Sequence, residues 1–255
     1  LLVQIDDQTL QERRIAVPRP MDRVLLADLV EALLPLNSSV IGLDYLLDRP
    51  HPETDATLQQ AFTAAVEQEI WLVFAARRND VGDWLTVAPT VASPNWSLSG
   101  NINAPRLQIR PRGWSARPHP LGYQIATADR LSRGLDAIAP LQPDLNSTEP
   151  LQVQIERYLS DQGQDSVLSP RSRLHPVTNF SYNLRQRWLQ PVIDYSLPPE
   201  RVYYRVSAWD LLQDPPQLLQ SLNLDSLEHQ VVIIVPGGYD EAGFSRDGED
   251  NLEPP

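Results

Sequence analysis

Charged side chains and glycines directly follow several apolar runs of this sequence. The opening run LLVQI is followed by Asp6 and Asp7, and the run VIGL by Asp44. Parallel strands of an open sheet present ligand-binding groups where their carboxyl ends meet, so we expect these groups to share one edge. The candidate binding residues are Asp6, Asp7, Asp44, Arg77, Arg78, Gly237 and Gly238.

Two interpretations of this set remain open. Carboxylates and guanidinium groups on one edge could bind a small charged ligand or a metal ion. Alternatively, the acids cap helices and the arginines form structural pairs with aspartates that close loops, because motifs of this looseness are only hypotheses.

The elements that position these residues alternate between strands and helices. After the first strand, Asp22 is placed to cap a helix whose apolar face is Leu26, Leu29, Val30 and Leu33. A buried strand follows at 40–43, a helix begins near Thr54, and a third strand covers 70–75. Strands and helices in this order with short links predict parallel pairing.

The rest of the chain is less regular. Residues 77–119 are rich in Pro, Asn and Ser, which indicates a loop-rich insertion or hairpin. Helices are expected after Pro120 and Pro150, and a short one after Ser207. Further strands are expected at 177–182, 202–206 and 230–235, before a mobile acidic tail at 236–255. The prediction is a single α/β domain over 1–255, with a mixed, mostly parallel sheet and helices on both faces.

Composition excludes several classes of function. The net charge of −12 disfavours nucleic-acid binding, which needs a basic footprint. The sequence contains no Cys and no Lys, so zinc–thiolate sites, thiol nucleophiles, Schiff bases and Walker-type phosphate binding lack their essential residue. The longest aliphatic run, 231–235, is far shorter than the roughly 20 residues of a membrane-spanning helix.

Catalytic and metal motifs are weak throughout. The start IDDQTL invites comparison with haloacid-dehalogenase-like phosphatases, but Asp6 and Asp7 are adjacent instead of spaced as D-x-D, and the usual lysine is missing. The tail carries acids suited to calcium, yet Gly248 does not occupy the EF-hand position, and a solvated loop fits better. No G-x-S-x-G motif and no histidine pair is present. We therefore predict no catalytic residues, no metal site and no cofactor.

Several segments in order resemble one known family. They are IDDQTL, VPRPMDR, VIGLDYLLDRPHPETDATLQQAF, VYYRVSAWDLL and VVIIVPGG, and together they resemble the CHASE-two extracellular sensory domain. The stretch 41–55 is the most specific part. The segments WSLSGNINAPR and VTNFSYN are similar to the cyanobacterial branch of that family. Family members commonly carry a tryptophan in the loop after the first strand. The matching region of this chain, around residues 17–19, has no tryptophan.

The resemblance implies an extracytoplasmic, periplasmic input domain of a bacterial transmembrane signalling protein. Membrane helices would lie outside residues 1–255, and the output would be a histidine kinase, an adenylate cyclase or a related domain. The sequence also lacks an initiator Met, so we expect it to be part of a longer chain. The leading hypothesis is a non-enzymatic sensor of an unknown small molecule or protein signal. Such a sensor could form a homodimer. The alternative is a structural module that dimerises the receptor without a ligand.

Overall fold

A seven-stranded sheet forms the centre of the protein. The computed structural model describes residues 1–102, 118–134, 140–162 and 203–237. The strands are β1 (Leu2–Ile5), β2 (Val40–Leu43), β3 (Trp71–Arg78), β4 (Trp84–Leu85), β5 (Ser97–Asn101), β6 (Arg205–Ser207) and β7 (Val231–Pro236).

The strand order confirms the predicted mixed, mostly parallel sheet. The path runs β4-β3-β2-β7-β1-β6, and β5 pairs with β3. Every pair is parallel except β3 with the short β4. The last strand in the described part of the chain, β7, therefore lies at the centre, between β1 and β2. The carboxyl ends of these three strands face the same edge.

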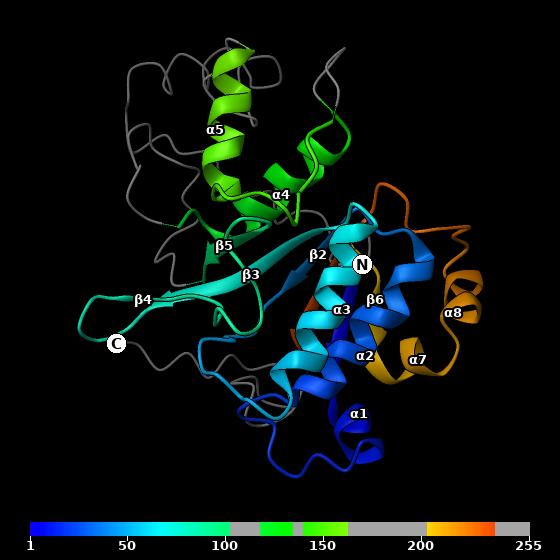
Figure 1. Ribbon diagram of the computed structural model, residues 1–255. Helices are drawn as coiled ribbons and strands as arrows, with labels where there is room; N and C mark the ends of the chain where they lie inside the picture. Colours follow the sequence, from blue (N-terminus) through cyan, green and yellow to red (C-terminus); the bar gives the residue numbers. More distant parts are fainter. Residues whose placement is uncertain (103–117, 135–139, 163–202, 238–255) are drawn as a thin grey trace, which may run out of the picture.

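Helices cover both faces of the sheet, as predicted (Figure 1). The helices are α1 (Asp7–Glu12), α2 (Arg23–Leu33), α3 (Asp55–Glu67), α4 (Leu121–Ser132), α5 (Leu151–Asp161), α7 (Ala208–Gln213) and α8 (Pro215–Ser221), with a 3-10 turn at Leu34–Leu36. Residues of α2, α3, α7 and α8 share one hydrophobic core with the sheet, and residues of α4 and α5 share a second.

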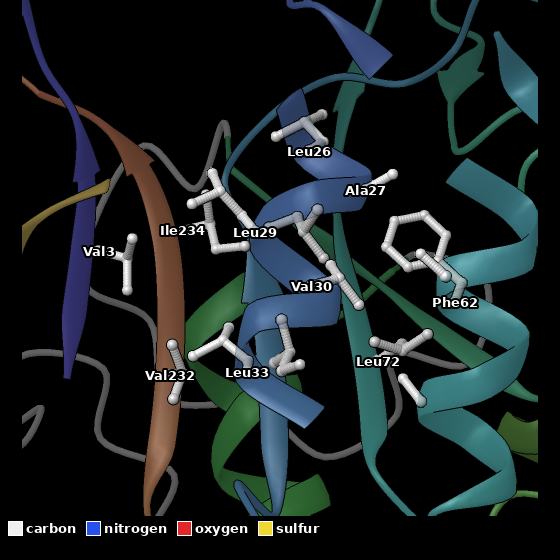
Figure 2. Close-up of a cluster of buried hydrophobic side chains, with 14 of the residues drawn as sticks. Val3, Leu26, Ala27, Leu29, Val30, Leu33, Phe62, Leu72, Val232 and Ile234 are labelled. Atoms are coloured by element: carbon white, nitrogen blue, oxygen red, sulfur yellow. The ribbon is translucent and has the colours of Figure 1, made fainter. Parts of the chain in front are cut away.

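The alternation of side chains along the strands separates the two cores. In β2, Ile41 and Leu43 belong to the larger core, and Val40 belongs to the smaller one. Figure 2 shows α2 lying over the sheet, with Leu29 and Leu33 towards Val232 and Ile234 of β7. Each fully buried side chain of this size contributes about 1.5–3 kcal/mol, so α2 fixes the central strands firmly.

The α2 helix begins and ends where its sequence predicts. The Asp22 carboxylate accepts hydrogen bonds from the backbone N–H groups of Val24 (2.7 Å) and Leu25 (2.9 Å), which confirms it as the N-cap. Pro35 stands in the 3-10 turn that follows, because proline has no N–H to continue an α-helix.

Two elements were not predicted from the sequence. The helix α1 begins directly after Asp6, and β5 lies within the segment expected to be a loop-rich insertion. The β5 sequence SLSGN is rich in residues that disfavour strands. Its position depends on tertiary packing: a Cβ on Gly100 would lie 2.4 Å from the Leu121 Cα, so only glycine allows α4 to approach this closely.

Some expectations fall outside the described residues. They are the strand at 177–182, the acidic tail from residue 238 onwards, and Gly238 itself. In the described part of the chain, no helix combines the length and the apolar character needed to cross a membrane.

Candidate functional site

Asp44 stands at the carboxyl end of a central strand. Its backbone N–H donates to the Ile234 carbonyl of β7 (3.0 Å), which extends the β2–β7 ladder by one residue. The side chain is half-buried, and burial raises the pKa of its carboxyl group. No hydrogen bond or ion pair to this carboxyl group occurs among the described residues. A half-buried carboxylate without a partner is costly, so this group is suited to accept a donor from outside the chain.

Asp6 has a structural role at the same edge. Its carboxylate accepts hydrogen bonds from the Thr9 backbone N–H (2.9 Å) and the Thr9 hydroxyl (2.7 Å), and it is the N-cap of α1. Asp7 is exposed on the first turn of that helix. Because β7 separates β1 from β2, and Asp6 lies level with Gly237, the Cα atoms of Asp6 and Asp44 are about 12 Å apart. Asp6 is therefore used within the fold to cap α1.

Gly237 directly follows β7, at the edge of the sheet that also carries Asp6 and Asp44. Its N–H donates to the Ile5 carbonyl (2.9 Å), and a Cβ at this position would lie 2.5 Å from the Gln4 Cβ. Glycine is required here because β7 and β1 approach closely as β7 ends.

Arg77 and Arg78 lie beyond this edge. In the ladder of β3 with β2, Phe74 is paired with Leu43, and β3 continues to Arg78. Both arginines are exposed and pair with β4 in a hairpin, where the Arg78 Nε donates to the Gly82 carbonyl (2.7 Å). Neither forms an ion pair with Asp44 in the described structure.

A buried ion pair between the first residues of α2 and α3 was not anticipated from the sequence. The Arg23 and Asp55 side chains are 3% and 4% exposed, and Nε of Arg23 lies 3.5 Å from Oδ1 of Asp55. The Asp55 Oδ2 accepts from the His51 backbone N–H (2.8 Å) and the Thr90 hydroxyl (2.5 Å). Burial lowers the pKa of Arg23, and the carboxylates of Asp55 and then Asp48 oppose that shift.

This pair holds the loop that follows Asp44. The Arg23 Nη2 donates to the Arg49 carbonyl (3.1 Å), and the Leu47 carbonyl accepts from the Ala88 N–H (2.8 Å). The ends of α2 and α3 and the segment after β4 are thereby joined to one loop. In the sequence, the only signal of this pair was Asp55 in the first turn of α3. An aspartate at such a position also interacts favourably with the helix dipole, so its position does not identify Arg23 as its partner.

The Arg23–Asp55 pair is not fully satisfied. The Nη1 of Arg23 and the Oδ1 of Asp55 are buried and have no hydrogen-bond partner among the described residues. In the same part of the structure, no group of three or more His, Cys, Asp or Glu side chains is arranged to hold a metal ion.

Comparison with known proteins identifies the family. A family model described as the CHASE2 domain matches residues 1–242. The chain belongs to the CHASE2 domain family. The expected resemblance to the CHASE-two type is thus confirmed. No curated protein and no solved structure gave a match.

The family sets the broad role of the molecule. CHASE2 domains are extracellular sensory domains of membrane signalling proteins. The match includes β1, β2 and β7, whose carboxyl ends carry Asp6, Asp44 and Gly237. Within the described residues the Asp44 carboxyl group has no partner, whereas Asp6 is used within the fold.

Proposed function

We propose that this CHASE2 domain is a non-enzymatic, periplasmic input module that binds a small ligand at the sheet edge around Asp44. The observation that carries the proposal is the Asp44 carboxyl group, half-buried at the end of β2 and without a partner among the described residues. A ligand with an ammonium or N–H group would supply the missing partner. Charge-assisted hydrogen bonds of this kind are the stronger ones, at about 1.5–3 kcal/mol each.

The position of Asp44 also supports a route for signal transmission. Asp44 is hydrogen-bonded to β7, and β7 pairs with β1 from Leu2 to Ile5. A ligand at Asp44 therefore acts next to β7, which in turn pairs with β1. Membrane helices are expected on both sides of a sensory domain of this family. A ligand that prefers one of two arrangements of β7 would shift the population between them.

The absence of catalytic motifs supports a sensor over an enzyme. The sequence has no lysine, no cysteine and no nucleophile elbow, and Asp6, at the same edge, is engaged as a helix cap. Asp44 accordingly serves for binding and not for chemistry.

A thermal-shift screen tests this function. The 255-residue chain and its Asp44→Asn variant are incubated with amines, amino acids, sugars and inorganic ions. Asp225→Asn, which changes an exposed acid, serves as the matched control. We expect at least one compound to raise the melting temperature of the wild type and the control but not of Asp44→Asn, because a ligand that binds only the folded state stabilises it by mass action.

Two outcomes would overturn the proposal. A flat response with a tight dimer in sedimentation would favour the assembly module instead. Turnover of generic phosphatase, esterase or glycosidase substrates that is abolished by Asp44→Asn would identify an enzyme.

A further inference from the structure

A pocket lies beside the β3–β4 hairpin and includes Asp48 of the loop that follows β2. It has a volume of about 410 Å³ and is lined mainly by apolar side chains, including Trp84, Leu85, Val87, Pro89 and Pro94. Ligand pockets in proteins commonly have volumes of about 300–1,000 Å³ and apolar walls with a few polar groups.

Among the described residues that line this pocket, Asp48 is the only charged one. It is half-buried and forms no ion pair or hydrogen bond through its side chain within the described part of the chain. Arg23, whose charge interacts with Asp48, is paired with Asp55 and donates to the Arg49 carbonyl. The Asp48 carboxylate is therefore available to a ligand, although it feels the charge of Arg23.

We propose that this pocket binds an organic ammonium ion with an apolar body. Asp48 supplies the counter-charge, Trp84 supplies an aromatic ring, and tryptophan is the side chain that attracts cations most strongly through its ring face. The apolar walls accommodate the rest of the molecule. The net charge of −12 adds a long-range attraction for cations and disfavours anions of the same shape.

Hydrogen bonds connect the pocket to the loop that follows Asp44. Ala88 is part of the pocket wall, and its N–H donates to the Leu47 carbonyl (2.8 Å). Thr90, two residues further along the chain, donates its hydroxyl group to Asp55 (2.5 Å). A ligand that moves this wall would pull on the loop that follows Asp44. The inference rests on the proposed sensory function only in treating the ligand as a signal. Binding itself is independent of it.

Three probes with the same aromatic body test the proposal. They are 2-phenylethylammonium, 2-phenylethanol and phenylacetate, titrated into the 255-residue chain and followed by NMR chemical shifts. We expect affinity to decrease from the ammonium to the alcohol to the carboxylate. Asp48→Asn should weaken ammonium binding about tenfold, the scale of one hydrogen bond to a charged group. It should weaken alcohol binding less, within about twofold, because the hydroxyl group carries no positive charge for the carboxylate to attract.

Two matched variants locate the site. Trp84→Leu should weaken ammonium binding by roughly three- to fivefold, as expected for a partly exposed cation–π contact. Asp83→Asn, an exposed acid one residue away, should change nothing. An unchanged melting temperature for each variant shows that folding is retained.

The results that would contradict binding in this pocket differ from those that would contradict the proposed function at Asp44. Equal affinity for the three probes, no detectable binding, or ammonium binding that Asp48→Asn leaves intact would overturn the pocket. Loss of ammonium binding in Asp44→Asn but not in Asp48→Asn would also overturn it, while supporting the Asp44 edge.

Discussion

Asp44 and Asp55 enclose the same loop but have opposite environments. Asp55 is almost fully buried, faces a guanidinium group and accepts two hydrogen bonds on one oxygen. Asp44 is half-buried, and its carboxyl group has no partner among the described residues. The first acid holds the fold together. The second costs the fold free energy, which is the behaviour expected of a group kept for binding.

This comparison shows that burial alone does not identify a functional acid. Asp55 is buried and Asp44 is half-buried, and the two differ mainly in the hydrogen bonds and ion pairs that their carboxyl groups form. Asp6 strengthens the point, because it shares the edge with Asp44 and is satisfied by Thr9. Three variants would break or sharpen the distinction.

Removing Asp55 should have the largest effect. Asp55→Ala leaves the buried Arg23 guanidinium without its counter-charge, and we expect the free energy of unfolding to fall by about 3–5 kcal/mol. Urea denaturation measures the change. The double variant Arg23→Met with Asp55→Leu should recover most of the loss, because it removes both charges. If Asp55→Ala costs no more than Asp225→Ala, an exposed control, the pair does not hold the loop.

Removing the α1 cap should have an intermediate effect. Asp6→Ala eliminates both acceptors for Thr9, and N-cap losses typically lower stability by about 1 kcal/mol. Asp7→Ala, one residue further on the exposed side of the helix, is the comparison. Chemical denaturation at pH 7 should rank Asp6→Ala as the less stable of the two. The opposite ranking would mean that Asp6 is not committed to the fold.

Replacing Asp44 should change stability in the other direction. Asp44→Asn removes a charge that burial disfavours, so we expect the free energy of unfolding at pH 7 to rise by on the order of 1 kcal/mol. A matched measurement on Asp225→Asn should show no change beyond about 0.5 kcal/mol. A loss of stability in Asp44→Asn would show that the ionised carboxylate has a stabilising partner.

The stabilisation by Asp44→Asn should depend on pH, and this is the smallest effect. Because burial raises the pKa of Asp44, the folded state binds this proton more tightly than the unfolded state does. The cost of the charge is present above the raised pKa and disappears as the pH falls below the ordinary value of 3.8. The difference in stability between Asp44→Asn and the wild type should therefore shrink towards zero below about pH 4. A difference that grows on acidification would contradict the assigned direction.

Local sequence patterns predicted most of the helices and strands, because the boundaries of these elements depend mainly on neighbouring residues. Asp22 caps α2, the run Val40–Leu43 forms β2, and Gly134 follows α4 with a φ of +77°, each as its immediate neighbours require. The strand β5 could not be predicted, because its Ser and Gly residues are held by contacts with β3 and α4 and not by propensity.

The site was predictable only in part. Asp44 was correctly placed at the end of a buried strand, since parallel strands deliver their carboxyl ends to one edge. Whether an acid is satisfied depends on distant residues, and the Arg23–Asp55 contact joins positions 32 residues apart. Helix capping by Asp6 involves Thr9 only three residues away and was one of the open interpretations, whereas no spacing in the sequence shows that Asp44 lacks a partner. The role of Asp44 in binding, like those of Arg77 and Gly237, stays a prediction.

The titration of Asp44 itself tests the central claim most directly. The carboxyl-carbon NMR signal of Asp44 is followed against pH in the free 255-residue chain, with Asp44→Asn used to assign the signal. If the carboxyl group is half-buried and has no partner, its pKa will lie above the ordinary value of 3.8. A pKa at or below that value would show that the protein already supplies a donor or a cation, and Asp44 would then belong with Asp55 as part of the fold.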